Sequence, residues 1–500
     1  MGTAQCVSAC NIILRKQGSV KGEIKAGTRR LTACGGGSII CPREVSGMQK
    51  HTVRMTEGSI GRHLFRYALP LFWGNLFQQL YNVVDSLVVG NTLGEDALAA
   101  VASSSSIIFL LVGFFTGTFV GASVVIARYF GEQNDEKLEA AIHTSVAFGL
   151  ICGVAVSIFG VFFTPHLLRW MDTPASVMPN SVLYFRVYFS GVLFSVMYNV
   201  AAGIFQAMGD TRHPLVYLVV SSVTNVVLDI VLITVFGMGV DGAALATVLS
   251  QALSCVLAFW RLTHSTDACR MEWKKVRIDR PVLGQLLALG VPSGLQYCIN
   301  SIGNIVAQSS INLFGAAAMG GCGAYWKVEG FAFLSINSCT SAASTFVGQN
   351  LGAKEYDRAK KGALIGILSC MALAQITGWL FAAFAPQVIS LFGGGADVVR
   401  FGTLQARIAC WFYFMIAMSN CAAGVLRGAG MSVTPMLIIT GSWCVLRVLY
   451  LLFIARPSGS LTMVLWGYPI TWFITFVLFA VILIRFDWAH YHDRKTAKAA

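Results

Sequence analysis

Two aspartates, Asp85 and Asp229, are the residues of this chain best suited to chemistry, because both lie inside long apolar runs. A charged acid at membrane depth costs about 2.5–3.5 kcal/mol or more, so it is usually there for a function. Burial favours the neutral form of an acid, which makes it an acceptor for a proton or a cation. The alternative for Asp85 is an acid near the lipid surface whose side chain extends outward to water.

An amide and a hydroxyl accompany these acids. Asn225 lies four residues before Asp229, so the two share one helix face. Thr247 lies inside the next apolar run, after a short glycine-containing turn. Carboxylate, amide and hydroxyl oxygens suit a hard cation, and two adjacent acids would titrate as a coupled pair. Ordinary hydrogen bonds between helices are the alternative role for Asn225 and Thr247.

The elements that must position these residues are membrane-spanning helices. Of the 500 residues, 56% are hydrophobic and only 12% are charged, whereas a soluble domain carries about 25% charged residues. The mean hydropathy of +0.67 is also that of a chain rich in apolar residues. The net charge of +13 comes from basic residues between the apolar runs, which positive cytoplasmic loops explain better than nucleic acid does. We therefore expect an all-α polytopic membrane protein.

Twelve apolar segments organise the chain into two lobes of six helices. We expect them at 64–90, 98–127, 141–164, 180–206, 214–236, 240–262, 283–312, 321–347, 361–385, 401–426, 434–455 and 461–485. The predicted parts are a disordered extension (1–54), a first lobe (55–262), an inter-lobe loop (263–282), a second lobe (283–485) and a tail (486–500). Met48 or Met55 is the expected working start.

The distribution of basic residues between the segments predicts the orientation of the chain. The inter-lobe loop carries Arg270, Lys274, Lys275, Arg277 and Arg280. The connections on the opposite side carry Arg169, Arg400 and Arg456. Because basic loops stay in the cytoplasm, we expect both termini and the inter-lobe loop there.

The two halves of the chain repeat each other with an offset of 221 residues. Matching pairs include Gly131 with Gly352, Asn199 with Asn420, and Pro214 with Pro435. Six spans per half give both halves one orientation, so the pseudo-two-fold axis lies along the membrane normal, and transporters of this kind bind substrate between their halves. Tyr450 occupies the position of Asp229, which places an ion site in the first half only.

Four further charged residues lie in apolar runs of the second half, and the sequence leaves their roles open: Lys327, Glu329, Arg407 and Arg447. They either face a central cavity or pair with other helices. The chain has no G-x-x-x-x-G-K-[ST] loop for ATP, and neither H-E-x-x-H nor G-x-S-x-G. An enzyme is therefore not expected, and an intramembrane enzyme is the distant alternative.

Several motifs together resemble the multidrug and toxic compound extrusion (MATE) family, in particular its DinF-like branch. They are Pro70 through Asp85, the Gly131–Gly352 pair, Asn225 through Asp229, and Val240 through Thr247. The resemblance covers about residues 60–485. It implies a first-lobe cation site at Asp85, Asn225, Asp229 and Thr247, with Tyr81 and Asn199 lining the same cavity and the first helix bending at Pro70.

The function implied by this resemblance is secondary antiport. We expect a monomeric protein of the cytoplasmic (inner) membrane that exports cationic or amphipathic drug-like compounds in exchange for H⁺ or Na⁺. No cofactor is expected, and no metal beyond Na⁺ at the coupling site. A flippase for lipid-linked precursors is the alternative within the same superfamily, and a passive channel is disfavoured by the repeated lobes and the asymmetric acids.

Overall fold

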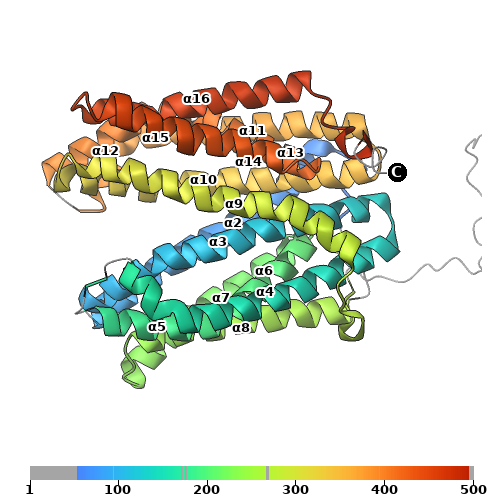
Figure 1. The fold of residues 1–500 in the computed structure, drawn as a ribbon, viewed down its shortest axis with the longest axis horizontal. Helices are drawn as coiled ribbons and strands as arrows, with labels where there is room; N and C mark the ends of the chain where they lie inside the picture. The colour runs from blue at the N-terminus through green and yellow to red at the C-terminus, as the bar shows by residue number, and fades with distance from the viewer. Residues whose placement is uncertain are drawn as a thin grey trace, which may run out of the picture. The chain divides into compact units, whose positions relative to one another are not determined.

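The computed structural model describes residues 53–494, except 94, 171–172, 175–176, 266–267, 269 and 394. The side chains of residues 86, 87, 91 and 95–112 are also not described. Helices are the regular secondary structure throughout these ranges (Figure 1). Most of the predicted N-terminal extension, residues 1–52, lies outside the described part, as do residues 495–500 of the predicted tail.

The first lobe contains the helices drawn from blue to green in Figure 1. They are α2 (Ile60–Leu93), α3 (Glu95–Glu132), α4 (Asp135–Trp170), α5 (Met178–Ser190), α6 (Val192–Ala207), α7 (Arg212–Ile230), the π-helical turn η1 (Val231–Val235) and α8 (Val240–His264). The inter-lobe loop contains a short 3₁₀ turn, η2 (Trp273–Lys275).

The second lobe contains the helices drawn from yellow to red. They are α9 (Arg280–Asn312), α10 (Ala316–Gly352), α11 (Tyr356–Ser390), α12 (Ala396–Ala409), the 3₁₀ turn η3 (Cys410–Phe412), α13 (Tyr413–Gly428), α14 (Val433–Ile439), the π-helical turn η4 (Thr440–Leu446), α15 (Arg447–Tyr450), the π-helical turn η5 (Leu451–Ala455) and α16 (Leu461–Arg485).

The described helices account for all twelve predicted spans. Nine stretches are long and apolar enough to cross a membrane, and the bent pair α5 and α6 makes a tenth. The other two predicted spans correspond to α2 and α10, which have 34 and 37 residues and are therefore long enough. Both carry polar residues along their length, such as Gln78 and Asn82 in α2 and Glu329 in α10. The least apolar spans are thus the ones that line the cavities described below.

The backbone confirms the internal repeat at its irregular points. Gln133 and Lys354, which are 221 residues apart, both adopt positive φ, of 58° and 60°. Gly191, between α5 and α6, corresponds to Phe412, where η3 interrupts the matching helix of the second lobe. The turn η1 corresponds to η5 in the same way. Because these are departures from ideal helix geometry, their repetition indicates a shared fold rather than a shared composition.

Each lobe has its own apolar core, and four helices join the lobes. The core of the first lobe is built from α3, α4, α6 and α8 together with the first turns of α9, and that of the second mainly from α10, α11, α13 and α16. Helix α3 packs along α9, and α2 packs along α10. The start of α9 is fixed locally, because the Asp279 carboxylate accepts a hydrogen bond of 3.0 Å from the N–H of Val282.

One end of the bundle is closed by contacts between the lobes. The Gln349 side chain in α10 accepts a 2.9 Å hydrogen bond from the N–H of Met55 and donates one of 2.8 Å to the carbonyl of Ala207 in α6. The Arg358 guanidinium donates to the carbonyl oxygens of Met55 and Glu57. Met55 is buried, so the bundle includes the residues just before α2.

The segment before Met55 also contacts the bundle. The N–H of Val53 donates to the carbonyl of Met208, and the guanidinium of Arg54 lies 6.0 Å from the ring centroid of Phe130. The last two residues of the predicted 1–54 extension are therefore packed against the first lobe.

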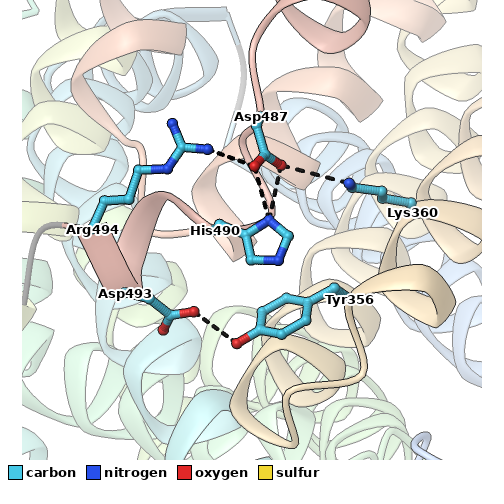
Figure 2. Close-up of polar contacts among 6 residues, drawn as sticks. All are labelled: Tyr356, Lys360, Asp487, His490, Asp493 and Arg494. Atoms are coloured by element: carbon cyan, nitrogen blue, oxygen red, sulfur yellow. Dashed lines mark hydrogen bonds and ion pairs between the residues drawn. The ribbon is translucent and has the colours of Figure 1, made fainter.

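The segment after α16 reaches the same end (Figure 2). Asp487 pairs with Lys360 of α11 at 3.5 Å and with His490 at 2.9 Å, and Asp493 accepts a 2.7 Å hydrogen bond from Tyr356. Beyond the residues drawn there, Arg128 of α3 is hydrogen-bonded to Nδ1 of His492 at 2.7 Å. The two ends of the described chain thus meet where the lobes are closed.

Candidate functional site

A cavity of about 660 Å³ lies in the first lobe, lined by α2, α3, α5, α6, α7 and α8 and by Tyr297 of α9. Five of the residues singled out in the sequence line it: Pro70, Tyr81, Asp85, Asn199 and Thr247. Pro70, Tyr81 and Asp85 come from α2, Asn199 from α6 and Thr247 from α8. The fold therefore brings together residues that are up to 177 positions apart in the sequence.

The other two predicted residues lie behind the cavity wall. Asn225 and Asp229 of α7 are almost completely buried, with 1% and 0% of their surface exposed. The Asn225 amide donates to Thr247 Oγ1 at 3.5 Å, which links α7 to α8. Asp85 and Asp229 are close enough for their carboxyl groups to interact with each other, and a shared proton would relieve the repulsion between two charged carboxylates.

The oxygens of this group lack donors among the described residues. No hydrogen bond is made there by Asp85 Oδ1, by Asn225 Oδ1 or by either carboxylate oxygen of Asp229. A buried polar atom without a partner is costly, so such atoms usually have a ligand, an ion or water. Oxygen ligands of this kind suit a hard cation such as Na⁺, and a proton would satisfy the acids equally well.

The helix that carries Asp229 ends in an irregular turn, whereas the helix that carries Asp85 is regular. The π-helical turn η1 begins two residues after Asp229, and such turns are frequent at functional sites. Helix α2 continues without interruption through Pro70, although a proline lacks the N–H that would complete the helical ladder. The bend expected at Pro70 is therefore not a break in the helix.

Some residues of this cavity were missed in the sequence. Tyr184 and Tyr188 of α5 line it, with ring centroids 6.4 Å apart and nearly parallel planes. Gln78 of α2 and Gln251 of α8 line it as well. The spacing of four between the two tyrosines was a signal that they share a helix face.

A second cavity, of about 760 Å³, lies between the lobes. It shares several wall residues with the first-lobe cavity, including Asn75, Gln78, Asn82 and Asn199. Its second-lobe wall carries charged residues: Glu329 from α10, Arg427 from α13 and Arg447 from α15. The two cavities are therefore neighbours that differ in the charges of their walls.

The structure assigns two of the four charged residues left open by the sequence to this central cavity. Glu329 and Arg447 line it, as just described. Lys327 and Arg407, by contrast, are exposed on the surface of the bundle, and the Lys327 ammonium lies 5.7 Å from the ring centroid of Phe392. The expectation that Lys327 and Arg407 are buried was wrong, because helix rotation directs these long side chains outward.

Comparison with known proteins identifies the family. The MatE family model matches residues 70–231 and again residues 292–453, one match in each lobe. The chain belongs to the MatE family.

Two relatives of this MatE protein illustrate the range of the family. It is 28% identical to the probable multidrug resistance protein YoeA of Bacillus subtilis over 77% of this chain and 85% of that protein. It is 24% identical to a FAD transporter of Shewanella oneidensis over 74% of this chain and 81% of that protein. The family match and these relatives, a probable multidrug resistance protein and a transporter, show a transport protein and not the intramembrane enzyme considered as the alternative.

The fold of the MatE protein matches that of a solved relative. A MOP superfamily transporter from Pyrococcus furiosus superimposes with a TM-score of 0.81 at 23% identity, over 90% of this chain and 99% of that one. The two-lobe architecture predicted from the repeat is therefore confirmed. With the MatE family match, the multidrug resistance relatives and the apolar helices, the protein is a multi-pass membrane transporter.

Proposed function

We propose that this MatE protein is a monomeric secondary antiporter that exports cationic or amphipathic compounds from the cytoplasm in exchange for H⁺ or Na⁺. The observation that carries the proposal is the proximity of two acids, the half-buried Asp85 on the wall of the first-lobe cavity and the buried Asp229 behind it, where this cavity adjoins the space between the lobes. The first-lobe location of these acids also favours the DinF-like branch.

Helix α2 is the element that can connect the ion to the lobes. It carries Asp85 and packs on α7, which carries Asp229, and it also packs on α10 of the second lobe. A cation or proton at the two acids changes the charge between α2 and α7. If this binding is tighter in one arrangement of α2, the gradient shifts the equilibrium between the two lobe arrangements.

The closed end of the bundle is compatible with an exchange between two lobe arrangements when this end is assigned to the cytoplasm. The inter-lobe loop and both ends of the described chain lie at the basic side, which the positive-inside rule places in the cytoplasm. The arrangement described here is then closed toward the cytoplasm and corresponds to the stage at which a compound leaves. Substrate would enter the central cavity after the Gln349 contacts have opened.

The test is transport by the purified protein in proteoliposomes. With ethidium as the transported compound, we expect an imposed pH gradient or an imposed Na⁺ gradient to drive its accumulation, and the other gradient to have little effect. Vesicles with an ionophore that dissipates the effective gradient are the control. Equal ethidium flux with and without any ion gradient would contradict antiport.

A flippase for lipid-linked precursors is the second candidate. The observation that favours it is the pair of arginines, Arg427 and Arg447, on the wall of the central cavity, since arginine binds phosphate well. Lys327 and Arg407, the other basic residues noted in the apolar runs of the second half, are exposed and do not line this cavity.

A further inference from the structure

We propose that the second-lobe wall of the central cavity is a subsite for the anionic group of an amphipathic substrate, a carboxylate or a phosphate, carried on a flat apolar body. This inference rests on the proposed export function and adds a substrate class to it. The charges point in this direction: among the described residues that line the central cavity, Glu329 is the single acid, whereas Arg427 and Arg447 are both basic. In the first-lobe cavity the charged lining residue is Asp85.

Arg427 is the cation that this wall leaves available. Its Nε is buried, and among the described residues nothing accepts a hydrogen bond from it. Its guanidinium faces the same cavity as Tyr297 of α9. A guanidinium offers five donors in a planar fork that matches two oxygens of a carboxylate or phosphate. Arg427 is half-buried on the cavity wall, and its buried Nε still has a hydrogen bond to give, so the side chain is prepared for an anion.

Arg447, in contrast, is held in place by the protein. Its Nε and one terminal nitrogen donate to Thr471 Oγ1 at 3.3 and 3.0 Å, and its guanidinium carbon lies 4.5 Å from the ring centroid of Tyr468 and 5.9 Å from that of Trp443. Glu329 is positioned by a 2.8 Å hydrogen bond from the Tyr325 hydroxyl. The rigid Arg447 and Glu329 offset each other's charge on this wall, and Arg427 supplies the excess positive charge.

Unpartnered polar atoms of the same wall point to a ligand independently of charge. Gln296, Thr340 and Tyr468 line the cavity, and each has a buried oxygen without a hydrogen-bond partner among the described residues. The Thr340 and Tyr468 hydroxyls can each donate to an anion, as can the Gln296 amide nitrogen. Buried polar atoms in this number are normally satisfied by something bound.

The apolar part of the substrate has a surface to contact in the same cavity. Trp443 and Trp472 line it next to Tyr468, and the Tyr468 and Trp472 rings meet edge to face with centroids 6.1 Å apart. Each aromatic ring offers a large contact area to a flat apolar molecule, so a few rings are enough to bind it. The wall thus combines donors for an anion with aromatic faces, as an amphipathic anion requires.

The alternative is a purely structural role for Arg427. It lies in the last turn of α13, where a basic side chain interacts favourably with the helix dipole. That role would affect every substrate equally through stability. An anion subsite would affect one charge class only, so a comparison of substrates separates the two roles.

The experiment compares two dyes that share a xanthene ring, the anion carboxyfluorescein and the cation rhodamine 6G. Affinity is measured on the purified protein in detergent without any gradient, and export is measured in proteoliposomes, with dye quantified at a fixed pH after lysis. For Arg427→Gln we expect at least a tenfold loss of carboxyfluorescein affinity and export, and less than a twofold change for rhodamine 6G. Arg427→Lys should retain most carboxyfluorescein binding.

The matched control is Arg407→Gln, which removes an exposed arginine of the same lobe and should change neither dye. Equal losses for both dyes, or unchanged carboxyfluorescein affinity, would overturn the subsite. Binding in detergent needs no ion gradient, so it tests the subsite separately from antiport. If the wild-type protein binds carboxyfluorescein but no ion gradient drives export, antiport is contradicted and the subsite is not. Competition by a polyprenyl phosphate would identify a lipid as the source of the anion, and its absence would identify a soluble compound.

Discussion

Gly131 of α3 and Gln349 of α10 are in backbone contact across the lobe interface, so close that a Cβ atom on Gly131 would lie 2.0 Å from the carbonyl oxygen of Gln349. The repeat places the reciprocal contact beside it: a Cβ on Gly352 would lie 2.1 Å from the carbonyl oxygen of Arg128. Two glycines at equivalent positions thus let α3 and α10 approach each other at the closed end. Neither helix can come this close with any larger residue.

Gly131→Ala should therefore open this end of the bundle. The added methyl group cannot be accommodated without a backbone shift, which typically costs about 1–3 kcal/mol. We expect a longer and broader distance distribution between spin labels at Lys137→Cys and Lys354→Cys, together with a lower Tm. Gly323→Ala, at a helical glycine with open space around its Cβ position, is the control. An unchanged distribution in Gly131→Ala would show that the contact does not hold the lobes together.

Asp85→Asn should uncouple transport while the protein still folds. The amide keeps the size of the side chain and is easier to bury than a charge, but it cannot take up a proton or attract a cation with a full charge. We expect gradient-driven export to fall at least tenfold, which corresponds to an increase of about 1.4 kcal/mol in the activation free energy of transport. Dye binding should persist. Export is measured in vesicles at a fixed gradient and at matched protein levels.

Asp229→Asn should have a similar effect, and the double variant should be little worse than either single one if, as proposed, the two carboxyl groups act on one proton or cation. Wild-type export by Asp85→Asn would remove this residue from the mechanism. It would then be a structural acid beside the cavity.

Pro70→Ala should slow turnover without preventing membrane insertion. Proline leaves the carbonyl four residues earlier without its helical partner, so this part of α2 can bend more easily than an unbroken ladder. Alanine restores the ladder and stiffens the helix that carries Asp85. The measurement is the export rate at saturating substrate, with Pro165→Ala in α4 as a control for replacing a helical proline outside the cavity. Equal rates for wild type and Pro70→Ala would remove the support for a hinge.

The docking of the segment after α16 should depend on pH. The hydrogen bond from His490, together with Lys360 and Arg494, holds the pKa of Asp487 below its ordinary value. A lowered pKa means that the ionised form is the docked form. The stabilisation that ionised Asp487 gives to docking is therefore complete above the ordinary pKa of an aspartate, about 4. It is lost as the pH falls through the lowered pKa of Asp487.

Hydrogen exchange of residues 486–494 measures this docking. We expect several-fold lower protection in Asp487→Asn than in wild type at neutral pH, and a fall in wild-type protection only below about pH 4. Asp397→Asn, at an exposed acid at the start of α12, is the control. Full protection in Asp487→Asn would show that the ion pairs in Figure 2 do not hold the segment.

The inter-lobe loop should be accessible from the cytoplasm only. Ser265 is buried, with 4% of its surface exposed, whereas Lys274 is exposed, so the label belongs at Lys274→Cys in a background without reactive thiols. An impermeant thiol reagent added outside intact cells should leave Lys274→Cys unlabelled and label Asp397→Cys at the opposite end. The reverse pattern would invert the topology.

The sequence predicted what depends on composition and repetition along the chain. The acids stood out because a charge in an apolar run is rare, and the lobes because Gly131 and Gly352 keep one offset. What it missed depends on helix rotation and long-range contacts. Arg427 was not singled out in the sequence, although its side chain lines the central cavity, and Arg407 was expected inside the protein, although it is exposed.

The closed end shows the same limit, since Gln349 contacts Met55 across 294 residues. The π-helical turns were also invisible to the sequence, because one extra residue per turn barely alters the periodicity of an apolar helix.

The two lobes repeat several irregular backbone positions but carry different side chains, Asp85 and Asp229 in one and Arg427 and Arg447 beside aromatic rings in the other. A gene duplication that preserves the hinges and interfaces leaves each copy free to specialise. If the arginine-bearing wall holds the substrate, as proposed above, changes there would alter what is exported without disturbing the acids of the first lobe. Separate sites for ion and substrate would let related proteins transport new compounds after a few substitutions. The second lobe would then be the place to engineer substrate selectivity.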